Sequence, residues 1–285
     1  MESKEEPCGG PTPTAGRPMI ISLANQKGGV AKTTTCVNLG AGLALRGHSV
    51  LLVDADPQAS LTRYFGQLEG GAVLGDWLLG RAEFDSAVRH TAFDRLDLLP
   101  TSEHLIADQA TIALDTFKGL HYLRQKLEQL RKRYDYILID TMPSFSVLFA
   151  NSLIAADQVL IPVKIEYLSA QGLNPLLEKV AEVRANFKQL KIVGLLGTFN
   201  RRGVDESDDC LADLHKLLPG QVLKTTIQLN SKLAKAARDC KPIQHFDRSC
   251  QGFTDYEALT EEILRKCPPS PRLAATRGRT AVKET

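Results

Sequence analysis

The sequence predicts an α/β fold in which a doubly wound, mostly parallel sheet carries helices on both faces. First, a short apolar strand at 19–24 leads through a glycine loop into an Ala/Leu-rich helix at 33–46. Second, later apolar runs alternate with segments of helical periodicity. Third, carboxylates lie at the ends of two such runs. Asp54 and Asp56 follow the run at 49–53, and Asp140 ends the run at 134–140. Parallel strands bring such residues to the carboxyl edge of the sheet, where ligands bind.

The composition is that of one large domain. The chain has 285 residues with 43% hydrophobic content, and we assign 19–267 to a single α/β domain. Residues 1–18 are rich in Glu, Pro, Gly and Thr and are expected to be disordered. Residues 268–285 are expected to form a basic disordered tail. No apolar run approaches the roughly 18 residues of a membrane span.

Charge and cysteine content exclude several classes of protein. The net charge of +2 creates no global field for nucleic acid, so any such binding requires a local patch. The six cysteines are scattered without a Cys-x-x-Cys pair, which argues against a zinc site and a disulfide framework. Reduced thiols in a cytoplasmic protein are the expected state.

The remaining elements follow from apolar runs and helical periodicity. We expect strands at 49–53, 96–99, 134–140, 157–163, 191–199 and 222–229. We expect a loop at 69–75 and helices within 76–92, within 102–133, from 173 onward, at 205–218 and at 254–266. Trp77 is expected to anchor the packing of its segment. One helical stripe is expected from Leu120, Leu123, Leu127 and Leu130.

The first loop has the composition of a phosphate cradle. Gly28 and Gly29 let the backbone curl so that successive N–H groups point at one oxyanion, and the helix N-terminus adds partial positive charge. Lys32 can reach the β- and γ-phosphates, and the Thr33 hydroxyl can bind Mg²⁺. The nucleotide-binding residues predicted here are Gly28, Gly29, Val30, Ala31, Lys32, Thr33 and Thr34.

The spacing Gly-x-x-x-x-Gly-Lys-Ser/Thr is not met, because Gln26 and Ala31 occupy its glycine positions. The loop reads Lys-Gly-Gly-x-x-Lys-Thr-Thr and resembles the deviant Walker A loop of the ParA/MinD family of dimeric ATPases. The resemblance implies a catalytic role for Lys32 and for Lys27, which would reach across a dimer to the partner's nucleotide. Ala31 replaces the family's usual glycine and would be strained by about 1 kcal/mol if its φ is positive.

The carboxylates extend this resemblance. The segment from Asp54 through Asp56 and Pro57 is similar to the family's Asp-x-Asp-Pro-Gln motif. The resemblance implies that Asp56 positions or activates the attacking water and that Asp54 supports the magnesium shell. An Asx turn before Pro57 is the alternative. Asp140 ends its strand in the Walker B pattern and would hold Mg²⁺ directly or through water. Met142 stands where the family usually has proline.

Two further regions are candidates for binding. Asn200 resembles the position at which family members contact adenine, and a polar turn is the alternative. Between 224 and 248, six Lys or Arg oppose two Asp, a local net charge of +4. In the family this region binds DNA without reading sequence, although Leu229 replaces one commonly basic residue. A solvated basic helix is the alternative. The stripe that could face phosphates comprises Lys232, Lys235, Arg238 and Lys241.

The resemblance implies a ParA/Soj-type partition ATPase that uses ATP and Mg²⁺ to segregate chromosome or plasmid DNA. It further implies an ATP-bound homodimer, non-specific binding to double-stranded DNA, slow hydrolysis that a ParB-like protein stimulates, and a cytoplasmic, nucleoid-associated location with no membrane partner.

Three alternatives remain open. A MinD-like membrane-cycling ATPase is disfavoured because 268–285 has no Leu/Phe/Trp stripe. An iron–sulfur relative is disfavoured because 142–168 contains no cysteine. The third alternative is a module that binds ATP with little hydrolysis.

Overall fold

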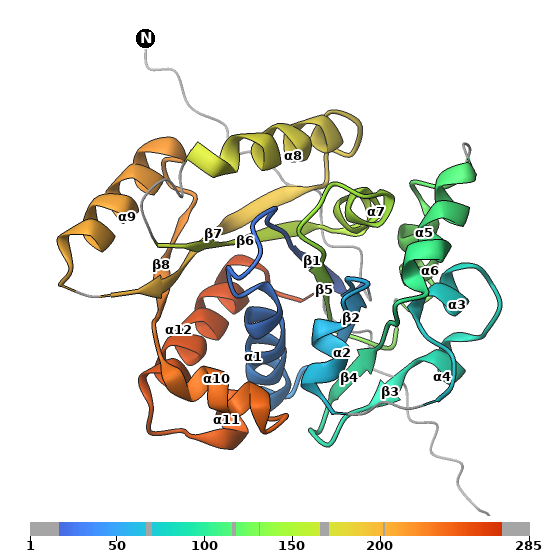
Figure 1. Ribbon diagram of the computed structural model, residues 1–285, viewed down its shortest axis with the longest axis horizontal. Helices are drawn as coiled ribbons and strands as arrows, with labels where there is room; N and C mark the ends of the chain where they lie inside the picture. The colour runs from blue at the N-terminus through green and yellow to red at the C-terminus, as the bar shows by residue number, and fades with distance from the viewer. Residues whose placement is uncertain are drawn as a thin grey trace, which may run out of the picture.

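The computed structural model describes residues 17–66, 70–115, 118–130, 132–165, 171–201 and 203–269. Within them the strands form one sheet in the order β3-β4-β2-β5-β1-β6-β7-β8 (Figure 1). Every pairing in the sheet is parallel except that of β3 with β4, which confirms the predicted fold class. The strands are β1 (Met19–Leu23), β2 (Val50–Ala55), β3 (Arg89–His90), β4 (Leu96–Leu99), β5 (Tyr136–Thr141), β6 (Gln158–Lys164), β7 (Lys191–Asn200) and β8 (Val222–Gln228).

Helices cover both faces of the sheet (Figure 1). One layer contains the helix that follows the glycine loop, which we call the P-loop helix. It is made of α1 (Lys32–Leu45), α2 (Ser60–Tyr64), α10 (Ser231–Arg238), α11 (Ile243–Phe246) and α12 (Gln251–Lys266). The opposite layer is made of α3 (Leu74–Leu78), α4 (Phe84–Ala87), α5 (Leu105–Leu114), α6 (Tyr122–Glu128), α7 (Val147–Ala155), α8 (Asn174–Asn186) and α9 (Asp205–Leu217). A short 3₁₀ turn, η1 (Gln171–Leu173), precedes α8.

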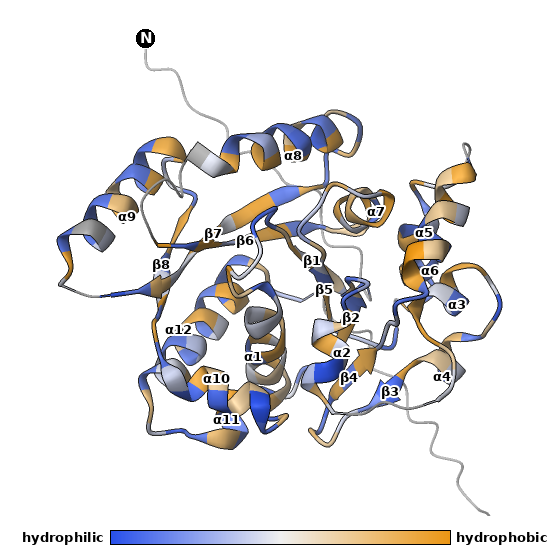
Figure 2. Cartoon of the chain, viewed as in Figure 1, coloured by the Kyte–Doolittle hydropathy of each residue, from blue (hydrophilic) through white to orange (hydrophobic). Residues whose placement is uncertain are grey.

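The central strands are apolar on both faces because both are covered. Along β2, Leu51 and Val53 contribute to one core, whereas Val50 and Leu52 contribute to the other. Figure 2 shows the resulting hydrophobic colour along the middle of the sheet and hydrophilic residues on the surrounding helices. Each central strand is therefore packed on both faces, and the carboxyl ends of the parallel strands lie together at one edge of the sheet.

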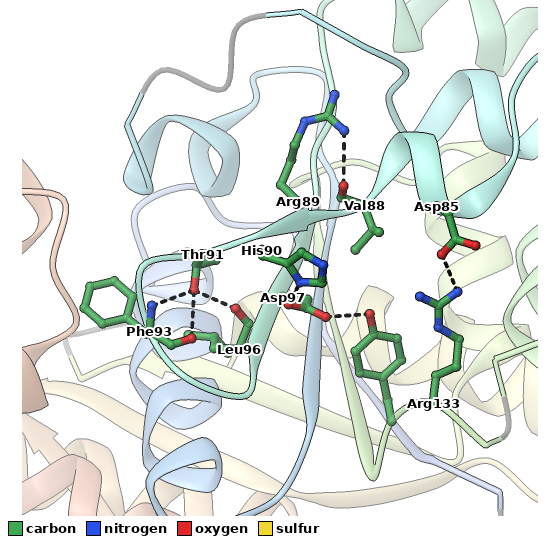
Figure 3. Close-up of polar contacts among 10 residues, drawn as sticks. Asp85, Val88, Arg89, His90, Thr91, Phe93, Leu96, Asp97 and Arg133 are labelled. Atoms are coloured by element: carbon green, nitrogen blue, oxygen red, sulfur yellow. Dashed lines mark hydrogen bonds and ion pairs between the residues drawn. The ribbon is translucent and has the colours of Figure 1, made fainter.

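The prediction for 69–92 is partly wrong. Helix α3 already begins at Leu74, inside the expected loop, and Arg89 and His90 form the antiparallel edge strand β3 instead of ending a helix. Figure 3 shows why this edge is ordered: the Thr91 hydroxyl donates to the Leu96 carbonyl at 2.6 Å and accepts from the Phe93 N–H. These bonds lie within the turn that joins β3 to β4, and a two-residue strand is too short to show an alternating pattern of its own.

Other packing predictions have mixed outcomes. Trp77 is buried, with its ring 5.2 Å from that of Phe84, which confirms it as an anchor. Leu120 is 49% exposed because α6 begins two residues later, so it does not belong to the predicted stripe. The other three leucines of that stripe are buried.

The structure also describes most of the cysteines and the end of the N-terminal segment. Cys36, Cys240, Cys250 and Cys267 form no disulfide within the described residues, and Cys8 lies outside them. Among the described helices, none has the length and apolar character needed to cross a membrane.

Arg17, which precedes the expected domain boundary, forms an ion pair with Asp157 at 2.9 Å. Residues 1–16 and 270–285, which make up most of the two expected tails, lie outside the described part of the chain.

Candidate active site

The glycine loop joins the end of β1 to the start of α1. Gly29 adopts φ +71°, and Ala31 adopts φ 69° and ψ 31°, both in the left-handed region. The condition under which Ala31 is strained is therefore met. A Cβ on Gly28 or Gly29 would meet no heavy atom within 4 Å, so Gly29 is required for its backbone angle rather than for space. The Val30 side chain is buried, which leaves only its backbone for a ligand.

The two lysines of the loop differ in environment. Lys32 is only 8% exposed, and its Nζ donates to the carbonyl oxygens of Asn25 at 3.1 Å and Lys27 at 3.2 Å. Burial lowers the pKa of Lys32, while the carboxylates of Asp140 and Asp56 oppose that shift. Lys27 is exposed, and its side chain passes so close to Gly172 that a Cβ there would lie 3.0 Å from Lys27 Cε.

Asp54 is buried at the end of β2 and organises the following loop. Its Oδ2 accepts from both the N–H and the hydroxyl of Thr62, each at 2.7 Å, and its Oδ1 accepts from the Asp56 N–H at 3.2 Å. Burial raises the pKa of Asp54 to about 6 despite these bonds. The predicted magnesium-shell residue thus fixes helix α2 and the loop before it.

Asp140 lies on β5, next to β2 in the sheet, and faces the helix that follows the loop. The Thr33 hydroxyl donates to Asp140 Oδ2 at 2.6 Å. Burial and the neighbouring carboxylate of Asp54 raise the pKa of Asp140 to about 8. The structure therefore places Lys32, Thr33 and both buried carboxylates in one region, at the start of α1 and the adjacent ends of β2 and β5.

Asp56 is half-buried, and its Oδ1 accepts from the Gln58 N–H at 2.9 Å. The Asx turn considered as the alternative is therefore present. Asp56 also lies close enough to Lys32 to influence its pKa. The turn and a role in the site are compatible, because only one carboxylate oxygen is engaged in the turn.

Several residues that shape the site were missed by the sequence analysis. Asn25 donates to the Pro162 carbonyl at 2.7 Å and accepts from the Lys27 N–H, which ties the loop to β6. The Thr198 hydroxyl donates to the Val30 carbonyl and ties the loop to β7. The bonds to β6 and to the Val30 carbonyl join residues 137 and 168 positions apart, so no local spacing identifies them.

Asn200 is buried at the end of β7. Its Nδ2 donates to the Thr226 hydroxyl at 3.0 Å, while its Oδ1 is buried without a hydrogen-bond partner in the described residues. An apolar cavity of about 440 Å³ lies beside the loop, between Ala31 and Thr34 on one side and Leu233 and other residues of β8 and α10 on the other. The residues that line this cavity do not include Asn200.

The predicted basic stripe is only partly helical. Lys232, Lys235 and Arg238 project from α10, whereas Lys241 lies in the turn between α10 and α11. All four side chains are exposed. Lys232 pairs with Asp247 at 3.0 Å, and Arg238 approaches the carboxylate of its neighbour Asp239 at 3.8 Å.

The donors at this site fit Mg²⁺. Asp140 Oδ1 is buried and has no hydrogen-bond partner within the described residues, and the Thr33 hydroxyl stands beside the other oxygen. Mg²⁺ is usually held by one or two carboxylates together with the phosphates of a substrate rather than by a complete protein cage. Within the described residues, no group of three or more His, Cys, Asp or Glu could hold a metal ion.

Comparisons with known proteins agree with this geometry. A family model described as an AAA domain matches residues 18–192. The chromosome-partitioning ATPase Soj of Treponema pallidum is 36% identical over 247 residues, covering 86% of this chain and 97% of that protein.

Two solved structures are also similar. One is cobyrinic acid a,c-diamide synthase of Mycobacterium smegmatis with a bound ATP analogue and magnesium, with TM-score 0.76 and 30% identity over 88% of this chain and 99% of that one. The other is a putative plasmid partition protein of Borrelia burgdorferi bound to AMPPNP, with TM-score 0.73 and 28% identity over 88% and 100% of the two chains.

A parallel sheet whose first strand runs through a lysine-bearing glycine loop into a helix, with carboxylates at adjacent strand ends, defines a P-loop nucleotide-binding ATPase. The chain belongs to the ParA/Soj family of P-loop ATPases with a deviant Walker A loop.

Proposed function

We propose that this protein is a partition ATPase that dimerises on ATP, binds DNA without sequence preference and is released from DNA by hydrolysis. The observation that carries the proposal is the environment of Asp140. Its Oδ1 is buried without a hydrogen-bond partner in the described residues, Thr33 donates to its Oδ2, and Lys32 lies within reach of its charge. The relatives named as partitioning proteins support the same role.

ATP would be held by the loop from Gly28 to Thr34, with Lys32 exchanging its two backbone carbonyls for the β- and γ-phosphates. Thr33 and Asp140 would hold Mg²⁺, which neutralises charge on the phosphates when bound. Asp56 would orient the attacking water through the oxygen that the Asx turn leaves available. The base would lie at the apolar cavity beside the loop, which is lined by Phe199, the residue before Asn200.

Lys27 would act on the nucleotide of the partner subunit. Its exposed side chain contacts Gly172 of its own chain and makes no ion pair among the described residues. Redirecting it therefore breaks no salt bridge within that part of the chain. A cation supplied in trans is worth about 10³–10⁵ in rate for arginine fingers, which sets an upper guide.

DNA would be bound by Lys232, Lys235, Arg238 and Lys241, and two such surfaces in a dimer would double the phosphate contacts. Each contact steepens the fall of log K with log salt by about 0.9. A ParB-like activator, a slow basal rate and a nucleoid-associated location complete the proposal. They come from the resemblance to the family, and two relatives are named as chromosome-partitioning proteins.

Light scattering with and without nucleotide tests the dimer. Wild type is expected to be monomeric with ADP and dimeric with ATP, and Lys27→Ala is expected to bind ATP yet release phosphate much more slowly. An ATP complex that stays monomeric contradicts the proposal. A parallel sedimentation with anionic vesicles separates the membrane-cycling alternative, which requires ATP-dependent binding to lipid.

A further inference from the structure

Helix α2 is docked onto the turn that carries Lys241. The Tyr64 hydroxyl donates to the Lys241 carbonyl at 3.1 Å. Two residues later, a Cβ on Gly66 would lie 3.9 Å from Cys240 Sγ. Figure 1 shows α2 and α11 both beside α1, although more than 170 residues separate Tyr64 from Lys241 in the chain. The two segments thus form one continuous surface.

The turn itself is held firmly against the P-loop helix. Lys241 N–H donates to the Ala236 carbonyl at 3.0 Å. Asn38 of α1 accepts from the Ile243 N–H at 2.7 Å through its side chain and from the Gln244 amide at 2.9 Å through its carbonyl. These bonds hold the turn against α1, so the fold determines which residues surround Lys241.

Arg63 is the residue that α2 adds to this surface. The helix buries Leu61 and Tyr64 against the core and leaves Arg63 exposed. Within the described part of the chain, Arg63 makes no ion pair, whereas Lys232 is paired with Asp247. An exposed guanidinium without a carboxylate partner is a better phosphate ligand than a lysine that must first leave an aspartate.

We propose that Arg63 contacts a DNA phosphate and that α2 is part of the DNA-binding surface together with α10 and the Lys241 turn. The inference rests on the proposed function, which places DNA on the α10 side. It extends that surface to a helix that begins four residues after Asp56 and is tied to Asp54 through Thr62. The nucleotide site and a phosphate contact would thereby share one short segment.

The test is fluorescence anisotropy of a mixed-sequence duplex against KCl concentration, with ATP, for the full chain. Arg63→Gln is expected to lower the slope of log K against log salt by about 0.9 for each protomer that contacts DNA and to weaken binding several-fold. Arg63→Lys is expected to restore most of the slope, because it keeps the charge. Arg184→Gln, on an exposed site of α8 over the opposite face of the sheet, is the matched control and is expected to change neither quantity.

Lys235→Gln distinguishes the role of Arg63 from the role of the α10 surface in DNA binding. If Lys235→Gln lowers the slope and Arg63→Gln does not, the DNA surface stands and the role of Arg63 is overturned. If neither variant changes the slope although DNA still binds, the proposed basic surface is wrong. Dimerisation on ATP, measured on the same variants, must be unchanged for either conclusion to concern DNA contact alone.

Discussion

Asp54 and Asp140 are paired in register on the neighbouring strands β2 and β5. Both are buried, and the carboxylate of Asp54 raises the pKa of Asp140, on top of the larger effect of burial. Two acidic groups this close in a low-dielectric interior are costly unless a cation compensates them. The arrangement is therefore better explained by a site that binds a metal ion and a nucleotide than by a contribution to the stability of the fold.

The raised pKa values predict how the stability of the nucleotide-free protein depends on pH. A carboxyl whose pKa is higher in the folded than in the unfolded state binds more protons when folded. Its stabilising contribution is present below the unfolded pKa of about 4 and is lost as pH rises through the folded value. That loss is expected up to about pH 6 for Asp54 and about pH 8 for Asp140.

Urea unfolding from pH 4 to 9 measures this effect by comparison with Asp140→Asn. The variant is expected to lose less unfolding free energy than wild type between pH 6 and 8, because its side chain has no proton to release. Asp209→Asn, an exposed site on α9, serves as the control and is expected to follow wild type. Parallel curves for wild type and Asp140→Asn would show that Asp140 titrates normally.

Thr62 is predicted to stabilise the loop that follows β2. Its hydroxyl donates to Asp54 and accepts from the Thr101 N–H at 3.0 Å. Thr62→Val removes both bonds at nearly constant shape, so the free energy of unfolding is expected to fall by about 1–3 kcal/mol. Thr111→Val, an exposed threonine of α5, is expected to stay within about 0.5 kcal/mol of wild type. Equal losses in the two variants would argue against a special role for Thr62.

Ala31 stores backbone strain at the start of α1. Because its φ is 69°, Ala31→Gly is expected to raise the free energy of unfolding by up to about 1 kcal/mol. Ala107→Gly, on the exposed face of α5, is expected to lower it by about 0.5–1 kcal/mol. Chemical denaturation of both variants gives the comparison, and a destabilised Ala31→Gly would mean that the left-handed angle is not maintained in solution.

Much of the fold could be predicted because buried parallel strands are locally apolar and end in recognisable residues. The strands that carry Asp54 and Asp140 and the loop around Lys32 are examples. Helix α7 was not predicted, because the run Val147–Ala155 is buried on nearly every side and shows no helical period. Thr62 lies eight residues after Asp54, and the two residues meet only because the loop between them folds back. No sequence motif marks a threonine at that spacing. The contact of Tyr64 with the Lys241 carbonyl likewise exists only in the folded chain.

Binding of mixed-sequence duplex DNA against salt concentration tests the central claim most directly. The conditions are no nucleotide, ADP, ATP, and ATP with Lys27→Ala. The account predicts tight, salt-sensitive binding of wild type with ATP alone, and loss of that binding in Lys27→Ala. Equal binding under all four conditions would show that the nucleotide does not control the basic surface, and it would contradict the partition mechanism while leaving the nucleotide site intact.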